Sequence, residues 1–147
     1  MTKPHSVQLP ETCREAIYTH GEKTFPEECC GTLLGRDGAD NVRQIVRVLP
    51  IDNTKGDNRQ RRYLIDPRAL LAAEKEARAC GLDVVGIYHS HPNHPSQASE
   101  FDRQHAMPYW SYVIVSIMDG KRAALQSWRL RDDRSLFDEE TIHSNIP

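Results

Sequence analysis

One segment limits the possible folds of this chain more than any other: an apolar, β-branched run at residues 84–88 leads directly into His89-Ser90-His91-Pro92. Such a run is typical of a buried strand, so we predict that the two histidines lie where that strand ends. Side chains two residues apart on an extended chain share a face. His89 and His91 can therefore point at one metal ion, while Ser90 turns to the opposite side.

A carboxylate follows at a distance that lets it join the histidines. Two prolines bend the chain away from the strand, and residues 99–107 predict a short helix that Pro108 ends. Ser99 is the expected N-cap, and Asp102 lies three residues later in the first turn, from where it can reach back to the strand end. Two imidazoles and one carboxylate leave a fourth tetrahedral position for water, which is the pattern of a catalytic zinc site with one Zn²⁺ per chain.

The pattern His-Ser-His-Pro, six residues, Ser, two residues, Asp resembles the signature of the JAMM (MPN+) metalloprotease family. An upstream Glu completes that signature, and Glu28 matches it. Glu28 stands three residues before Gly31, which is similar to the Glu-x-x-Gly segment of single-domain bacterial members, whereas the neighbouring Glu27 does not fit this spacing. The resemblance covers residues 7–130, and no position of the signature departs from the pattern.

The resemblance implies a role for each of these residues. His89, His91 and Asp102 are expected to bind zinc, Glu28 to act as general acid/base, and Ser99 to donate a hydrogen bond to the developing oxyanion. A purely structural role for Ser99, as a helix cap, is the alternative. Zinc lowers the pKa of bound water to near 7 and polarises a scissile carbonyl, so a nearby carboxylate that transfers protons completes a peptidase.

The resemblance also implies a fold and a substrate class. The expected fold is α/β, a single mixed sheet flanked by helices, with an outline similar to that of cytidine deaminases. Eukaryotic JAMM enzymes that cleave ubiquitin chains carry an insertion after the catalytic Asp, but here only eight residues separate Asp102 from Ser111. The chain is therefore more similar to small bacterial members, which hydrolyse the bond after the Gly-Gly end of a ubiquitin-like sulfur-carrier protein.

Alternative functions stay open at this point. A JAMM peptidase that acts on cell-wall or phage-tail peptides would carry the same signature, and related domains without metal ligands act as non-catalytic scaffolds. The basic loop with Arg59, Arg61 and Arg62 either meets an acidic carrier face or is simply solvated.

Two other classes of zinc enzyme are disfavoured. Metallo-β-lactamase-type hydrolases carry His-x-His-x-Asp-His, but Asn93 replaces the acidic residue here. Nucleobase deaminases need His-x-Glu and Pro-Cys-x-x-Cys, and neither is present. We expect His94 at the rim of the site, and His105 either as a partner of Asp102 or half-buried.

The four cysteines have no Cys-x-x-Cys spacing, which argues against a second zinc site and a redox pair. Cys29 and Cys30 are expected to form one buried and one semi-exposed thiol. At 147 residues the chain is expected to form one domain, 1–147, and its net charge of −2 favours neither nucleic acid nor a membrane surface as partner. With no signal peptide and no apolar run long enough to span a bilayer, a cytoplasmic location is expected.

Hydrophobic patterns and turn residues predict the other elements. A first helix is expected over residues 11–20, with Cys13, Ala16 and Ile17 on one side and Gly21 closing it. A second helix is expected from Asp66-Pro67 to Cys80, ended by Gly81. Strands are expected at residues 32–35 and 42–49, joined by a turn at 37–40, and at 63–65, 111–118 and 123–130.

Overall fold

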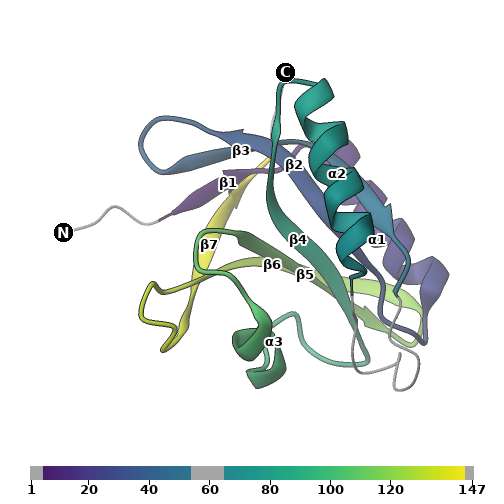
Figure 1. The fold of residues 1–147 in the computed structure, drawn as a ribbon. Coiled ribbons are helices and arrows are strands. Elements are labelled where there is room, and N and C mark those ends of the chain that lie inside the picture. The colour runs from purple at the N-terminus through teal and green to yellow at the C-terminus, as the bar shows by residue number, and fades with distance from the viewer. Residues whose placement is uncertain (1–4, 54–64, 145–147) are drawn as a thin grey trace.

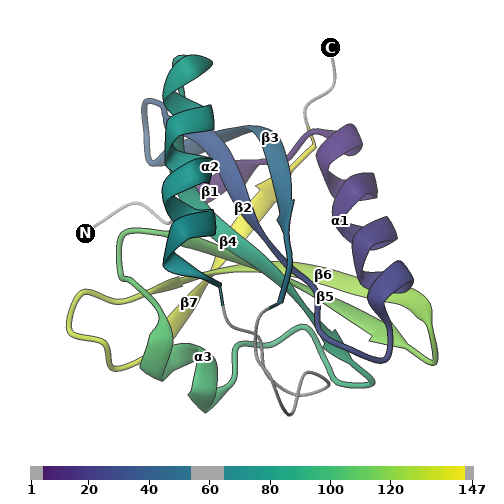
Figure 2. The same cartoon turned by 45° about the vertical axis from the view of Figure 1, so that its right-hand side comes forward.

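A computed structural model describes residues 5–53 and 65–144 of the chain. Over these residues seven strands form one sheet, two long helices pack against it, and a short helix lies apart from them at one end (Figures 1 and 2). In chain order the elements are β1 (Ser6–Gln8), α1 (Glu11–Thr24), β2 (Cys30–Asp37), β3 (Val42–Ile51), α2 (Pro67–Ala79), β4 (Asp83–Pro92), α3 (Glu100–His105), β5 (Ser111–Met118), β6 (Lys121–Leu130) and β7 (Phe137–His143).

The sheet is mixed, as predicted, but it closes into a barrel with the strand order β1-β3-β2-β4-β5-β6-β7. β1 pairs in parallel with both β3 and β7, and β4 pairs in parallel with β5, whereas the other neighbours are antiparallel. The expectation of a single mixed sheet with helices packed against it is confirmed, but the closure of this sheet into a barrel is not part of that expectation. Neither closing strand is predicted from the sequence, because β1 has three residues and β7 is largely polar. The likeness to deaminases stays a prediction.

Two consecutive leucines show how the sheet separates two hydrophobic layers. Leu33 packs in a cluster with Cys13 and Ile17 of α1, whereas Leu34 packs in another cluster with Ala77 of α2. Neighbouring side chains on a strand point to opposite faces, so α1 and α2 cover opposite faces of the sheet. In Figure 2 the two helices stand on either side of β2 and β3.

Helix α1 begins at Glu11 and continues to Thr24, so the prediction that Gly21 ends it is wrong. A Cβ atom at residue 21 would lie 3.0 Å from the Ile117 side chain, which means that glycine allows the helix to pack closely on β5. Of the three residues expected on the inner side of this helix, Cys13 and Ile17 are buried, but Ala16 is exposed.

The predicted hairpin and second helix are confirmed. β2 and β3 pair antiparallel, and both strands are longer than expected. The Asp66 side chain accepts a hydrogen bond from the Arg68 N–H, Pro67 is the first helical residue, and Gly81 follows the helix with φ of +72°. β5 has the predicted bounds, and β6 begins two residues earlier than predicted.

Two predicted features fall largely outside the described residues: the strand at 63–65, of which only Ile65 is described, and the basic loop with Arg59, Arg61 and Arg62. None of the helices in the described part of the chain is long and apolar enough to cross a membrane.

Candidate metal centre

Strand β4 carries both candidate histidines in its last four residues. The strand runs to Pro92. At His89 its backbone is paired with β2 on one side and β5 on the other, and at His91 it is paired with β5. Ser90 points the other way, and its hydroxyl oxygen accepts a hydrogen bond from the Cys29 N–H at 2.8 Å. The predicted alternation of side chains is therefore confirmed.

Helix α3 supplies the carboxylate. It is shorter than predicted, and Ser99 is its N-cap, as expected. The Asp102 N–H donates to the Ser99 hydroxyl oxygen at 3.1 Å, and the Ser99 N–H donates to Asp102 Oδ2 at 2.8 Å. This reciprocal capping box fixes the orientation of the Asp102 side chain.

The carboxylate of Asp102 lies between the two imidazoles. Its Oδ1 atom is 3.2 Å from His89 Nε2, and its Oδ2 atom is 3.3 Å from His91 Nε2. One ligand atom from each residue can be chosen so that all three lie within 4.8 Å of one another. Tetrahedral ligands that bond zinc at about 2.0–2.2 Å lie roughly 3.3–3.6 Å apart, so the three side chains fit a shared metal ion.

The orientation of His91 is set by a carbonyl group. His91 Nδ1 lies 2.8 Å from the Pro95 carbonyl oxygen, which can only accept, so Nδ1 carries the proton and the Nε2 lone pair is available to a metal. The next residue anchors this loop: the Ser96 hydroxyl donates to Gln126 Oε1 at 2.7 Å, and Trp128 Nε1 donates to the Ser96 carbonyl at 2.9 Å. Sequence reasoning missed this support, because its partners on β6 are about 30 residues away.

Glu28 lies just before β2 and faces His89. Its side chain is buried, and Glu28 Oε1 is 3.6 Å from His89 Nδ1. The Glu28 carbonyl accepts a hydrogen bond from Asn53 Nδ2 at 3.2 Å. At Gly31, three residues on, a Cβ atom would lie 2.2 Å from the Tyr88 ring, so the Glu-x-x-Gly spacing coincides with a close approach of β2 to β4.

Burial and neighbouring charges have opposite effects on the pKa values of His89 and Asp102. Burial lowers the pKa of His89, but the Asp102 and Glu28 carboxylates outweigh it and raise that pKa to about 10. Burial raises the pKa of Asp102, but His89, His91 and the Ser99 backbone hold it well below its usual range. The two carboxylates thus favour the protonated form of His89, and a metal ion that binds this imidazole takes the place of that proton.

A groove of about 490 Å³ opens beside the candidate ligands. Glu28, His91, Ser99 and Asp102 line it, and the exposed His94 lies on its border, as predicted. Since the Ser99 hydroxyl accepts its bond from Asp102, the hydroxyl hydrogen remains available to a bound molecule.

Neither expectation for His105 is confirmed. The residue is exposed, its Nδ1 lies 2.9 Å from the Phe101 carbonyl oxygen, and its ring stacks on the Phe101 ring.

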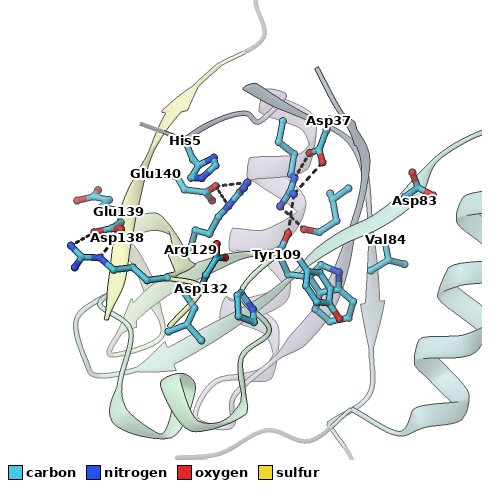
Figure 3. A pocket seen from close by; sticks show the side chains of 16 residues that line it. His5, Asp37, Asp83, Val84, Tyr109, Arg129, Asp132, Asp138, Glu139 and Glu140 are labelled. Carbon is cyan, nitrogen blue, oxygen red and sulfur yellow. Dashed lines mark hydrogen bonds and ion pairs between the residues drawn. The ribbon is translucent and has the colours of Figure 1, made fainter. Parts of the chain in front are cut away.

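A larger cavity, of about 1010 Å³, lies away from this centre and contains none of its residues (Figure 3). Arg43 projects into it and directs its donors to the Asp37 carboxylate, the Val85 and Tyr109 carbonyls and the Ser111 hydroxyl. These contacts join β2, β3, β4 and β5, so the buried Arg43 guanidinium stabilises the barrel and takes no part in the candidate metal centre.

Both thiols of the Cys29-Cys30 pair are buried, so the prediction of a semi-exposed thiol is wrong. Cys29 packs in the same cluster as Cys13 and Ile17 of α1, and the Cys30 thiol lies 3.5 Å from the Ile51 carbonyl oxygen of β3. Cys13 is also buried, and Cys80 is exposed.

Residues 10–131 match the family described as prokaryotic homologs of the JAB domain. The chain is 36% identical over 117 residues to a probable TtuB-protein conjugate cleaving protease of Thermus thermophilus, a match that covers 80% of this chain and 74% of that protein. It is 31% identical over 123 residues to a desampylase of Haloferax volcanii, covering 80% and 85%. It is also 30% identical over 118 residues to a CysO-cysteine peptidase of Mycobacterium tuberculosis, covering 80% and 77%.

Among solved structures, a protein of Desulfitobacterium hafniense studied in solution has a TM-score of 0.82 and 31% sequence identity, with 96% of this chain and 94% of that chain covered. The similarity thus extends over the barrel and its helices.

Proposed function

This chain belongs to the prokaryotic JAB family, and from that premise we propose that it is a zinc-dependent peptidase that hydrolyses the peptide or isopeptide bond after the Gly-Gly end of a ubiquitin-like sulfur-carrier protein. One observation carries the proposal: His89, His91 and Asp102 converge at the end of β4, and the buried Glu28 carboxylate faces the same place. We infer that residues 1–147 act as one domain in the cytoplasm.

His89, His91 and Asp102 would hold the zinc ion, with Nε2 of each imidazole directed at the carboxylate. Bound zinc supplies Lewis acidity and lowers the pKa of water in such a site to near 7. The Pro95 carbonyl keeps His91 in the tautomer that can act as ligand.

Glu28 is the proposed general acid/base. Its carboxylate accepts a proton from the attacking water as the new bond from oxygen to the scissile carbon forms. It then returns that proton to the departing amine as the bond from carbon to nitrogen breaks. Proton transfer by a positioned side chain of this kind contributes about 10²–10⁴-fold to the rate.

Ser99 is the proposed hydrogen-bond donor to the oxyanion. It borders the groove, and its hydroxyl hydrogen is not used by the cap. The cap places the hydroxyl beside a metal ligand, so one residue can both shape the helix and serve the transition state.

The names of the relatives support the substrate class. The Thermus protein is named for cleaving TtuB conjugates, and the mycobacterial protein is named as a CysO-cysteine peptidase. We infer that an extended, glycine-rich tail of the carrier lies in the groove between Glu28 and Ser99. The glycines of this tail have no side chains, so its backbone can approach the candidate metal centre.

The proposal is tested with a sulfur-carrier protein extended past its Gly-Gly end, incubated with zinc-loaded wild type and with Glu28→Ala, and analysed by mass spectrometry. A product that ends at Gly-Gly from wild type alone is the expected result. Zinc bound at one per chain without cleavage would redirect the search to cell-wall or phage-tail peptides. Neither zinc binding nor cleavage would favour a scaffold.

A further inference from the structure

Ser90 lies between the two candidate histidine ligands but takes no part in their group. It is fully buried on the opposite side of β4 from them. Its contacts lead to β2: the Ser90 N–H donates to the Cys29 carbonyl at 3.2 Å, and the Cys29 N–H donates to the Ser90 hydroxyl oxygen at 2.8 Å. Cys29 directly follows Glu28, so Ser90 holds the backbone beside the proposed acid/base.

The second of these bonds departs from regular pairing. In an antiparallel ladder every second pair of opposite residues exchanges two backbone hydrogen bonds, and the bond from the Ser90 N–H to the Cys29 carbonyl marks these two residues as such a pair. The β2–β4 ladder is regular at its last paired position, Cys30 with His89, but one step further the Cys29 N–H bonds to a side chain rather than to the Ser90 carbonyl. The path of the chain that carries Glu28 therefore depends on this hydroxyl.

We propose that Ser90 is a positioning residue, which sets the place of the Glu28 carboxylate relative to His89 and His91 through its hydrogen bond to the Cys29 N–H. One strand then holds the two histidines with one face and the acid/base segment with the other. The inference rests on the proposed role of Glu28 in peptide hydrolysis, whereas the bond itself is a feature of the fold.

Removal of the hydroxyl leaves two possibilities for the buried Cys29 N–H. It either stays without an acceptor, which is unfavourable in a protein interior, or it moves to the Ser90 carbonyl and draws the chain into regular pairing. Both shift Glu28, whose Oε1 now lies 3.6 Å from His89 Nδ1. A displacement of about 1 Å in a catalytic group can lower the rate about 10²-fold.

The first test is structural and does not depend on the substrate. Crystal structures of zinc-loaded wild type, Ser90→Ala and Ser90→Thr are compared at Glu28. We expect the carboxylate to move by about 1 Å in Ser90→Ala and to keep its place in Ser90→Thr, which retains the acceptor. An unmoved Glu28 in Ser90→Ala would overturn the proposal, as would Ser90→Thr behaving like Ser90→Ala.

The second test separates positioning from general destabilisation. We expect Ser90→Ala to lower kcat about 10²-fold with little change in KM or zinc affinity, and Ser90→Thr to restore it. In a Glu28→Gln background the same substitution should change kcat/KM by less than about twofold, because residues that act as one unit are not additive. An equal loss in both backgrounds would mean that Ser90 acts independently of Glu28.

Ser127→Ala is the matched control. Ser127 is also a buried strand serine with a hydroxyl hydrogen bond, at 2.7 Å to Glu140 Oε1, but it lies on β6 in contact with β7. The Ser127→Ala substitution should lower the thermal stability of the protein without lowering kcat. If wild type and Glu28→Gln are equally inactive on the extended carrier, the proposed function fails, while the position of Glu28 in Ser90→Ala still decides the role of Ser90.

Discussion

Ser99 and Asp102 cap each other's backbone, and Asp102 Oδ2, which accepts from the Ser99 N–H, is also 3.3 Å from His91 Nε2. The helix cap and the candidate metal centre therefore share an atom. We predict that Ser99→Ala lowers turnover about 10²–10³-fold through loss of an oxyanion donor, with zinc content unchanged. The lost cap should cost about 1 kcal/mol in the free energy of unfolding. Steady-state kinetics and metal analysis measure the two effects.

Asp66→Ala controls for capping alone, because Asp66 accepts from the Arg68 N–H at the start of α2. It should cost similar stability and leave turnover intact. Loss of zinc in Ser99→Ala would mean that the residue serves the centre only through the cap.

Trp128 should affect metal binding from a distance. Its indole N–H holds the Ser96 carbonyl, and the adjacent Pro95 carbonyl orients His91. We predict that Trp128→Phe, which keeps an aromatic ring but removes the donor, weakens zinc binding about tenfold, the lower end for outer-shell partners. Competition with a chromophoric chelator measures the affinity.

Trp110→Phe serves as the comparison, because Trp110 packs against the cluster that contains Ile87 and Tyr112 and lines the larger cavity rather than the groove. Its zinc affinity should match that of wild type. A wild-type affinity for Trp128→Phe would show that the loop holds its shape without this bond.

The four cysteine thiols should differ strongly in how fast they react with a thiol reagent. Burial raises the pKa of Cys29 to about 11 and that of Cys30 to about 12, and it also raises the pKa of Cys13. We predict that a disulfide reagent at neutral pH modifies exposed Cys80 rapidly and the other three roughly 10²-fold or more slowly, because the thiolate is the reactive form. Cys80→Ser should abolish the fast phase, and a second fast thiol would contradict the burial of the other three cysteines.

His20 should make the fold less stable in mild acid. Its Nδ1 lies 2.7 Å from the Tyr88 hydroxyl, and burial lowers its pKa below the ordinary value of 6.5. Below about pH 6.5 the unfolded chain therefore binds more protons than the folded chain, so stability falls until the pH passes the folded-state pKa. We predict that His20→Gln flattens this part of the stability curve, measured by urea unfolding between pH 8 and 5.

The same experiment on His105→Gln supplies the contrast, since His105 is exposed on α3. An identical pH dependence in wild type and His20→Gln would show that His20 is protonated in both states alike.

Local patterns predicted the convergence of His89, His91 and Asp102, because strand alternation and helix capping act over a few residues. The burial of Glu28 beside His89 was accessible only through the family spacing to Gly31, since a glutamate before a strand carries no local signal. The contacts of Ser96 with β6, and the hydrogen bond that the Cys29 N–H donates to the Ser90 hydroxyl oxygen, depend on strands that meet only in the folded chain.

The closed barrel escaped prediction for a related reason. β1 has only three residues, too few for a periodic pattern that would predict a strand. The length of α1 was missed for a similar reason: a glycine predicts the end of a helix unless its packing against Ile117 is known. Tertiary packing decided both outcomes.

Although β1 is short, it affects whether the protein aggregates in concentrated solution. Its three residues cover part of the edges of β3 and β7 at the same time. Open strand edges recruit strands of other molecules, and proteins commonly shield them against aggregation. Proteolytic loss of these few amino-terminal residues would therefore leave the candidate metal ligands in place but would open the barrel and expose the edges of β3 and β7.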